Sequence, residues 1–228
     1  MFKKSFMAMM ALFLVLFVTG CGGGNKDNAQ KAAADKPEFS ADQAVLGYAE
    51  MYAFGVTEHE KEAGLTEADL QKYGNKIIGE TTEAFAEFPL SEDNVATMVG
   101  NYVGTLSQAM EMKAEVVKDD PEHPVVKLSA KTLNQKGAEE VAANNEDLLA
   151  LGTAMGTLQA QGLSLDEMKA NEEFQKSAME VLNKFVSAFP MNPEASIEVT
   201  CDKVKGADGK FYWAPQDKAA LETFVQPK

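Results

Sequence analysis

The stretch MKAEVVKDDPEHPVVKLSA at residues 112–130 decides the fold class, because the spacing of apolar residues changes within it. Before the central turn, apolar and charged residues alternate, with the apolar ones at Met112, Ala114 and Val116. The residues DDPEHP at 119–124 have the composition of a turn. Alternation then resumes, with apolar residues at Val126, Leu128 and Ala130. A period of two is typical of a strand with one buried face, so this stretch predicts an antiparallel hairpin.

A second hairpin is predicted near the C-terminus, around a turn at residues 206–209. The apolar face of its first strand is expected to carry Ile197, Val199 and Cys201, and the second strand carries Phe211 and Trp213. Helical spacing predicts five amphipathic helices and a short terminal one: between Ser40 and Gly64, between Thr66 and Pro89, after Ser91, from Val141 to Gly162, between Ser164 and Pro190, and from Gln216 to Val225. Capping boxes are predicted at three starts: Ser40 with Gln43, Thr66 with Asp69, and Ser164 with Glu167.

These elements predict one α+β domain over residues 41–228. Its four-stranded antiparallel sheet, made of two hairpins, is expected to pack against about five amphipathic helices. The sequence leaves open whether the two helices between the hairpins join the same core or form a flap.

The N-terminus has the pattern of a secretory signal. Lys3 and Lys4 precede an apolar run of 13 residues at 6–18. A helix of that length spans about 20 Å, which is too short for a hydrocarbon core of about 30 Å. The run ends at Val18-Thr19-Gly20-Cys21, which resembles the bacterial lipoprotein signal. The resemblance implies cleavage between Gly20 and Cys21 and attachment of diacylglycerol and palmitate at Cys21. The alternative interpretation is a plain secretory signal whose cleavage site happens to precede a cysteine.

The predicted organisation is therefore a signal peptide at 1–20, a lipidated cysteine with a flexible linker at 21–40, and the folded domain. The linker has a root-mean-square reach on the order of 25 Å. This places the protein on the extracytoplasmic face of a bacterial membrane, inner or outer, held by lipid. Removal of Lys3 and Lys4 changes the net charge from −14 to −16, so we expect an acidic body that stands off anionic lipid.

Composition excludes several classes of partner and site. All 21 positive charges are lysines against 35 acidic residues, and an acidic chain without arginine is not expected to bind nucleic acid. Two cysteines and two histidines exclude most zinc sites and disulfide frameworks. No cofactor is predicted.

The order of the predicted elements resembles a known class of protein. A lipoprotein cysteine, a linker, helices and strands at 111–117, 124–133, 196–205 and 209–213 are similar to bacterial lipoproteins that carry an NTF2/cystatin-like domain of an uncharacterised family. The resemblance implies a sheet that can curl around a cavity, and it supplies no catalytic residues.

The residues that could carry chemistry are few. Glu58, His59 and Glu62 would share a face if helical and could then ligate a divalent cation, but an exposed, charged helix end is favoured and no metal site is predicted. His123 is expected to be a solvated turn residue, and Cys201 a buried core thiol. No nucleophile elbow, phosphate-binding loop or Cys-x-x-Cys motif occurs, so no catalytic residues are predicted.

Aromatic residues leave two functions open. The aromatic residues considered are Tyr48, Tyr52, Tyr102, Phe211 and Trp213, together with Tyr73 and Phe85. These side chains can line a pocket under the sheet for a small apolar or amphipathic ligand, or they can fill the core. The leading hypothesis is a non-catalytic, lipid-anchored domain that docks a protein or envelope partner. A ligand-binding module is the alternative, and a hydrolase is the third.

Overall fold

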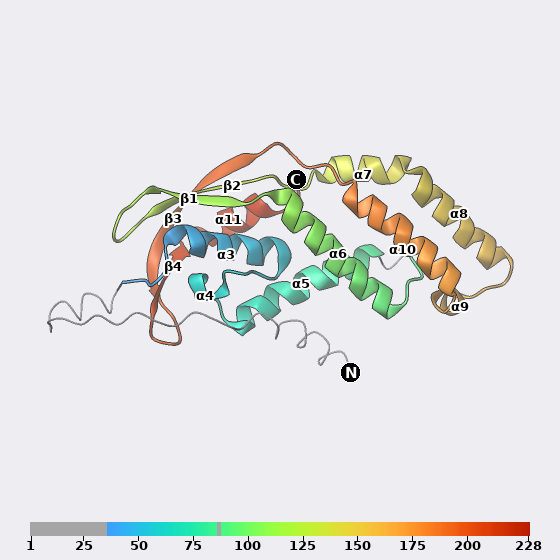
Figure 1. The fold of residues 1–228 in the computed structure, drawn as a ribbon, viewed down its shortest axis with the longest axis horizontal. Helices are drawn as coiled ribbons and strands as arrows, with labels where there is room; N and C mark the ends of the chain where they lie inside the picture. The colour runs from blue at the N-terminus through green and yellow to red at the C-terminus, as the bar shows by residue number, and fades with distance from the viewer. Residues whose placement is uncertain (1–35, 86–87) are drawn as a thin grey trace, which may run out of the picture. The chain divides into compact units, whose positions relative to one another are not determined.

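The computed structural model describes residues 36–85 and 88–228 of the chain. The predicted signal peptide and the lipidation residues Gly20 and Cys21 lie outside the described residues. The elements follow in this order (Figure 1): α3 (Ala41–Phe54), α4 (Glu60–Ala63), α5 (Glu67–Phe85), α6 (Glu92–Met110), β1 (Lys113–Lys118), β2 (Val125–Ala130), α7 (Gln135–Asn144), α8 (Glu146–Ala160), α9 (Leu165–Lys169), α10 (Glu172–Ser187), β3 (Ala195–Lys205), β4 (Phe211–Pro215) and α11 (Lys218–Val225). None of these described helices has the length and apolar character needed to cross a membrane.

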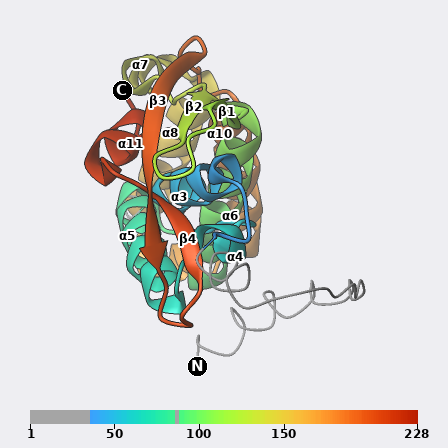
Figure 2. The ribbon, with the colours of Figure 1, turned by 90° about the vertical axis from the view of Figure 1, so that its left-hand side faces the viewer.

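The four strands form one antiparallel sheet in the order β1-β2-β3-β4, which confirms the predicted α+β fold class. Strand β3 has 11 residues and joins the two hairpins. Its first half pairs with β2, where Val199 lies opposite Val126, and its second half pairs with β4, where Cys201 lies opposite Pro215. β2 and β4 therefore flank successive lengths of β3 (Figure 2).

Helix α3 lies against this sheet and is almost fully enclosed (Figure 1). Nine of its 14 residues are buried, so it is covered on nearly every side. The inner face of the sheet supplies part of this core: Val126, Leu128, Ala130, Val199 and Cys201. Four other helices add one or more buried residues: Ala63 of α4, Leu70 of α5, Leu106 and Met110 of α6, and Leu221 of α11. A helix that is apolar on nearly all sides is stable only when its whole surface is buried, and the strands and four helices bury it here.

The helices between the hairpins build a second core away from the sheet. Helix α10 packs on the first half of α6, and α8 and α9 pack on α10. Their shared core contains these buried side chains: Met98, Leu151, Met168, Phe174, Ala178, Leu182 and Val186. Tyr102 and Phe189 contact both cores. We refer to α8, α9, α10 and the first half of α6 as the helical lobe.

Three predicted helices are each divided in two, so the described residues form nine helices instead of six. Gly55 ends α3 with a left-handed φ of 71°, which glycine adopts readily. Asn145 and Asn171 each accept a hydrogen bond from a backbone N–H three residues further on, at 2.9 Å, and so start α8 and α10. The sequence signal was an asparagine followed by two acidic residues, which is typical of a helix start.

Two of the predicted capping boxes are confirmed, at Thr66 with Asp69 and at Ser164 with Glu167. The box at Ser40 is wrong, because its hydroxyl donates to the Gln43 side chain and no backbone N–H is capped. The predicted burial of Val116 is also wrong, since it is 38% exposed. It lies on edge strand β1 next to a bulge, beyond the cover of the core.

We expect opposite effects from alanine at two helical glycines. A Cβ at Gly47 would lie 2.8 Å from both the Ala63 Cβ and the His59 carbonyl oxygen, so Gly47→Ala should lower the free energy of unfolding by about 1–3 kcal/mol. A Cβ at Gly104 would meet nothing within 4 Å, so Gly104→Ala should raise it by about 0.5–1 kcal/mol. Urea unfolding followed by circular dichroism measures both; two changes of the same sign would contradict the packing of α3 on α4.

Candidate functional site

A surface hollow of about 530 Å³ lies between the start of α6, the end of α9 and α10. Its polar lining mixes both signs of charge: Ser91, Asn94, Lys169, Glu172 and Lys176. The first turns of α6, α9 and α10 bring further carboxylates close by: Glu92, Asp93, Asp166, Glu167 and Glu173. The lysines therefore do not create a positive site for an anion.

The buried amide beside this hollow is Gln175, which is 8% exposed. Its Nε2 donates to the carbonyl oxygens of Pro89 at 2.8 Å and Met168 at 3.1 Å. Its Oε1 accepts from the Ser91 N–H at 2.9 Å and the Asn94 Nδ2 at 2.8 Å. All four of its hydrogen-bonding positions are used, so Gln175 joins α6, α9 and α10 and offers nothing to a ligand.

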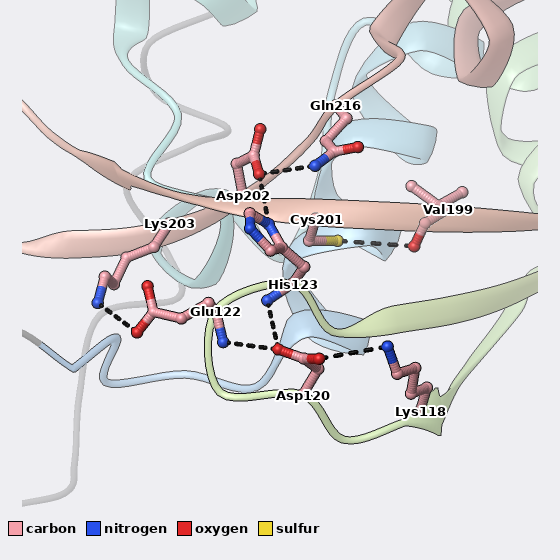
Figure 3. Close-up of polar contacts among 9 residues, drawn as sticks. All are labelled: Lys118, Asp120, Glu122, His123, Val199, Cys201, Asp202, Lys203 and Gln216. Atoms are coloured by element: carbon pink, nitrogen blue, oxygen red, sulfur yellow. Dashed lines mark hydrogen bonds and ion pairs between the residues drawn. The ribbon is translucent and has the colours of Figure 1, made fainter.

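The polar cluster around His123 lies where the β1–β2 turn meets β3 (Figure 3). The His123 Nδ1 is 2.9 Å from the Asp202 Oδ1, and the Gln216 Nε2 donates to the same oxygen at 2.8 Å. The side chains of His123 and Asp202 are 59% and 45% exposed. His123 is therefore a solvated turn residue, as predicted, with a carboxylate partner that the sequence did not indicate.

Asp120 holds the turn in shape. Its Oδ1 accepts from the backbone N–H groups of Glu122 and His123, both at 3.0 Å. These two hydrogen bonds, with a smaller contribution from Lys118, lower the pKa of Asp120 to about 2. Figure 3 also shows the ion pair between Lys203 and Glu122, whose Nζ and Oε1 atoms lie 3.5 Å apart. The turn therefore contacts β3 through two side-chain pairs, Glu122 with Lys203 and His123 with Asp202. These contacts position a loop, and they do not bring the imidazole to a nucleophile.

Cys201 follows the predicted core role. It has no exposed surface, and strand alternation places it on the face opposite Asp202. Burial is the main reason that the pKa of its thiol rises to about 12. The thiolate needed for nucleophilic chemistry is therefore not formed near neutral pH.

The helical face considered for Glu58, His59 and Glu62 is not formed. Helix α4 begins at Glu60, so Glu58 and His59 precede it and do not share a helical face with Glu62. The His59 Nδ1 lies 3.1 Å from the Glu50 Oε2, and the Thr57 hydroxyl donates to the same oxygen. Across residues 36–85 and 88–228, no group of three or more His, Cys, Asp or Glu side chains is placed to hold a metal ion.

Three of the five aromatic residues considered for a pocket are packed in the main core: Tyr48, Tyr52 and Trp213. The Tyr52 ring meets the Tyr73 ring edge-on at 5.0 Å between centroids, and burial raises the pKa of Tyr48 to about 12. Tyr102 packs edge-on against Phe189, with centroids 6.1 Å apart. Phe211 is half-buried on β4. None of the five lines the hollow of about 530 Å³, and the side chain of Phe85 lies outside the described residues.

The least expected surface is on α8. Residues 148–165 contain no charged side chain, although 25% of the chain is charged and about four or five would be expected there. Only Leu151 of α8 is buried, against α10, and Leu149 is 59% exposed. We define the α8 outer face by six exposed residues: Leu149, Gly152, Thr153, Gly156, Thr157 and Ala160.

The threonines and glycines of the α8 outer face have no packing or hydrogen-bonding partner in the described residues outside the helix itself. The hydroxyls of Thr153 and Thr157 donate to the carbonyl oxygens of Leu149 and Thr153 of the same helix, both at 2.9 Å. A Cβ at Gly152 or Gly156 would meet nothing within 4 Å, so packing within the chain does not require glycine at either position. This face was not predicted from the sequence, although the absence of charged residues over 148–165 was a signal for it.

Comparison with known proteins adds little to this geometry. No protein-family model matches the chain, and no curated protein matches it. A crystal structure of a protein described as a "putative lipoprotein (ycdA)" from Bacillus subtilis is similar, with a TM-score of 0.45 and 16% identity. The match covers 89% of this chain and 60% of that chain, so this chain spans about three fifths of that protein. Similarity at this level does not establish a shared function, and the NTF2/cystatin-like resemblance stays a prediction.

We expect Cys201→Ser to lower the free energy of unfolding by about 1–3 kcal/mol. The thiol donates to the Val199 carbonyl oxygen at 3.9 Å, which is too long for a hydroxyl, so the substitution buries a hydroxyl without a well-placed partner. The native thiol should react with a maleimide only as fast as the domain unfolds. Labelling at increasing urea concentration measures this, with Cys201→Ser as the unlabelled control. Rapid labelling in the absence of urea would contradict the core role.

Proposed function

We propose that this chain is a bacterial lipoprotein, held on the extracytoplasmic face of a membrane through Cys21, whose non-catalytic domain docks a protein partner. The observation that carries the proposal is the segment Val18-Thr19-Gly20-Cys21 directly after an apolar run of 13 residues. Two or more acyl chains give a stable anchor, whereas one gives marginal binding. Cys201 is buried, which leaves Cys21 as the cysteine that can be modified.

The docking role is supported by the α8 outer face. An exposed, uncharged helix face is unusual on a chain with a net charge of −14, because acidic side chains elsewhere keep the surface solvated. Glycine inside a helix costs about 0.5–1 kcal/mol relative to alanine. No neighbouring atom in the described residues requires glycine at 152 or 156, so packing within the chain does not offset this cost. The close approach of a partner protein's backbone would explain why both positions lack a side chain. The ligand-binding and hydrolase alternatives have no specific observation in their favour among the described residues.

The anchor predicts a definite mass and a definite fractionation. The protein extracted from its own membrane should be heavier than the chain from Cys21 onwards by two or three acyl chains, as intact-mass spectrometry measures. Cys21→Ser should lose this added mass and leave the membrane fraction. Cys201→Ser, the matched control, should keep the added mass and stay in the membrane fraction. A Cys21→Ser protein that stays in the membrane with its added mass unchanged would contradict the anchor.

Docking predicts a site-specific contact in intact cells. A photo-crosslinking amino acid at Thr157 should give a discrete protein adduct, because this position lies on the α8 outer face. Gly156→Lys places a charge in that face at a position with open space, so the adduct should be lost while the fold is kept. The same probe at exposed Glu180 of α10 is the control. Equal adducts from Thr157 and Glu180, or an adduct that survives Gly156→Lys, would contradict docking through α8.

A further inference from the structure

Helix α8 lies at the outer edge of the helical lobe, where α10 is the helix that packs on it most extensively (Figure 1). Leu151 is buried on the side of α10, whereas the α8 outer face stays exposed from Leu149 to Ala160. An added Cβ at Gly152 or Gly156 would meet no atom of the described residues outside the helix within 4 Å. Another protein can therefore lie along the whole length of this face.

Side chains on the α8 outer face complement one another in size when the helix is turned end for end. Two antiparallel helices that cross between Ala154 and Met155 bring residues at equal distances from this point to the same height. Each larger side chain of one copy then lies opposite a smaller residue of the other: Leu149 with Ala160, Thr153 with Gly156, and Thr157 with Gly152. Contact around a two-fold axis requires such self-complementarity, because both subunits use the same surface.

Charge favours the antiparallel arrangement of two copies of α8. Glu146 and Asp147 lie in the first turn of α8, and residues 148–165 carry no charge. Two parallel copies would bring these carboxylates next to each other, where like charges repel. In the antiparallel pair, the carboxylates of one helix lie beside the uncharged C-terminal end of the other helix, so no like charges of α8 meet.

The polar groups of the α8 outer face do not oppose this contact. The hydroxyls of Thr153 and Thr157 already donate to carbonyl oxygens of α8 at 2.9 Å, so they lose no hydrogen bond when water is excluded. Small residues at 152, 156 and 160 let two helix backbones approach closely. The pair therefore gains close packing without leaving either hydroxyl unpaired.

The area of the α8 outer face also limits what binds there. Three of its six residues are glycine or alanine, and a stable interface buries about 800 Å² of each partner, which one helix face of this kind does not supply. The contact is therefore weak unless its partners are held close together. Lipid anchoring through Cys21 would hold copies of this chain on one membrane surface, which raises their effective concentration for one another as a linker does.

We infer that the α8 outer face pairs with the α8 outer face of a second copy of this chain, antiparallel, around a two-fold axis near residues 154–155. This inference deepens the proposed docking function, and it rests on that function and on the proposed anchor. Two other occupants compete for the face: a different protein, and the outer face of α6 in another copy. That α6 face also lacks charge over residues 94–110, and a Cβ at Gly100 or Gly104 would likewise meet nothing within 4 Å.

Disulfide formation between two copies tests the register of this pair. Two differently tagged full-length chains, Leu149→Cys and Ala160→Cys, are expressed together, and the isolated membranes are oxidised. A mixed disulfide should form between the two variants, because these positions lie opposite each other. The Leu149→Cys chain should not link to itself, since its two thiols lie about 16 Å apart along the helices at about 1.5 Å per residue. The chain with its natural cysteines, of which Cys201 is buried, is the control without a disulfide.

Charge insertion identifies the surfaces in contact. Gly156→Lys in both chains should abolish the mixed disulfide, because it places an ammonium group near the centre of the uncharged pair. Gly104→Lys is the matched control, since it makes the same change at an open helical glycine of α6, and it should leave the disulfide intact. Loss of the disulfide with Gly104→Lys would overturn the inference. A Leu149→Cys chain that links to itself in place of the mixed disulfide would overturn it as well.

Photo-crosslinking at Thr157 in the same cells separates failure of this inference from failure of the docking proposal. An adduct that carries both tags and has the mass of two chains supports the second copy. An adduct with a different protein, together with no mixed disulfide, would overturn the inference and leave docking through α8 in place. Absence of any adduct from Thr157 would overturn both.

Discussion

Enclosure of α3 is the interaction on which the other contacts of the domain depend. Its buried side chains meet the inner faces of the strands on one side and α4, α5 and α11 on the other. Each large side chain buried in this way contributes about 1.5–3 kcal/mol, so the helix acts as the centre of the main core. Gly47 and Gly55 allow α4 and α5 to approach its backbone closely. The strands must then keep their apolar residues on one face, which is the alternation that the sequence shows.

A second core separates the molecule into parts with different surfaces. The long helix α6 enters both cores, since Met98 belongs to one and Met110 to the other. The strand-containing segments, residues 113–131 and 195–228, have nine lysines and nine acidic residues. The helical lobe holds an excess of carboxylates and, on α8, a face without charge.

The candidate sites were predictable to different degrees. Cys201 and His123 were placed correctly, because strand alternation and turn composition depend on adjacent residues. The helical face considered for Glu58, His59 and Glu62 does not form, because the chain turns at Gly55 and α4 starts only at Glu60. The partner of His123 could not be predicted, since Asp202 lies 79 residues further on and meets it only when β3 pairs with β2.

The sequence by itself determined the fold class, the two hairpins, the helix starts at Thr66 and Ser164, and the buried thiol. Each of these follows from residues within about one turn of helix or one strand, where period and capping act. Only the tertiary structure decided that the helices between the hairpins form their own core, which Gln175 holds to the start of α6 across 84 residues. It also decided which face of α8 stays uncovered. Such contacts depend on which surfaces meet after folding, and a local pattern of apolar residues is compatible with several of them.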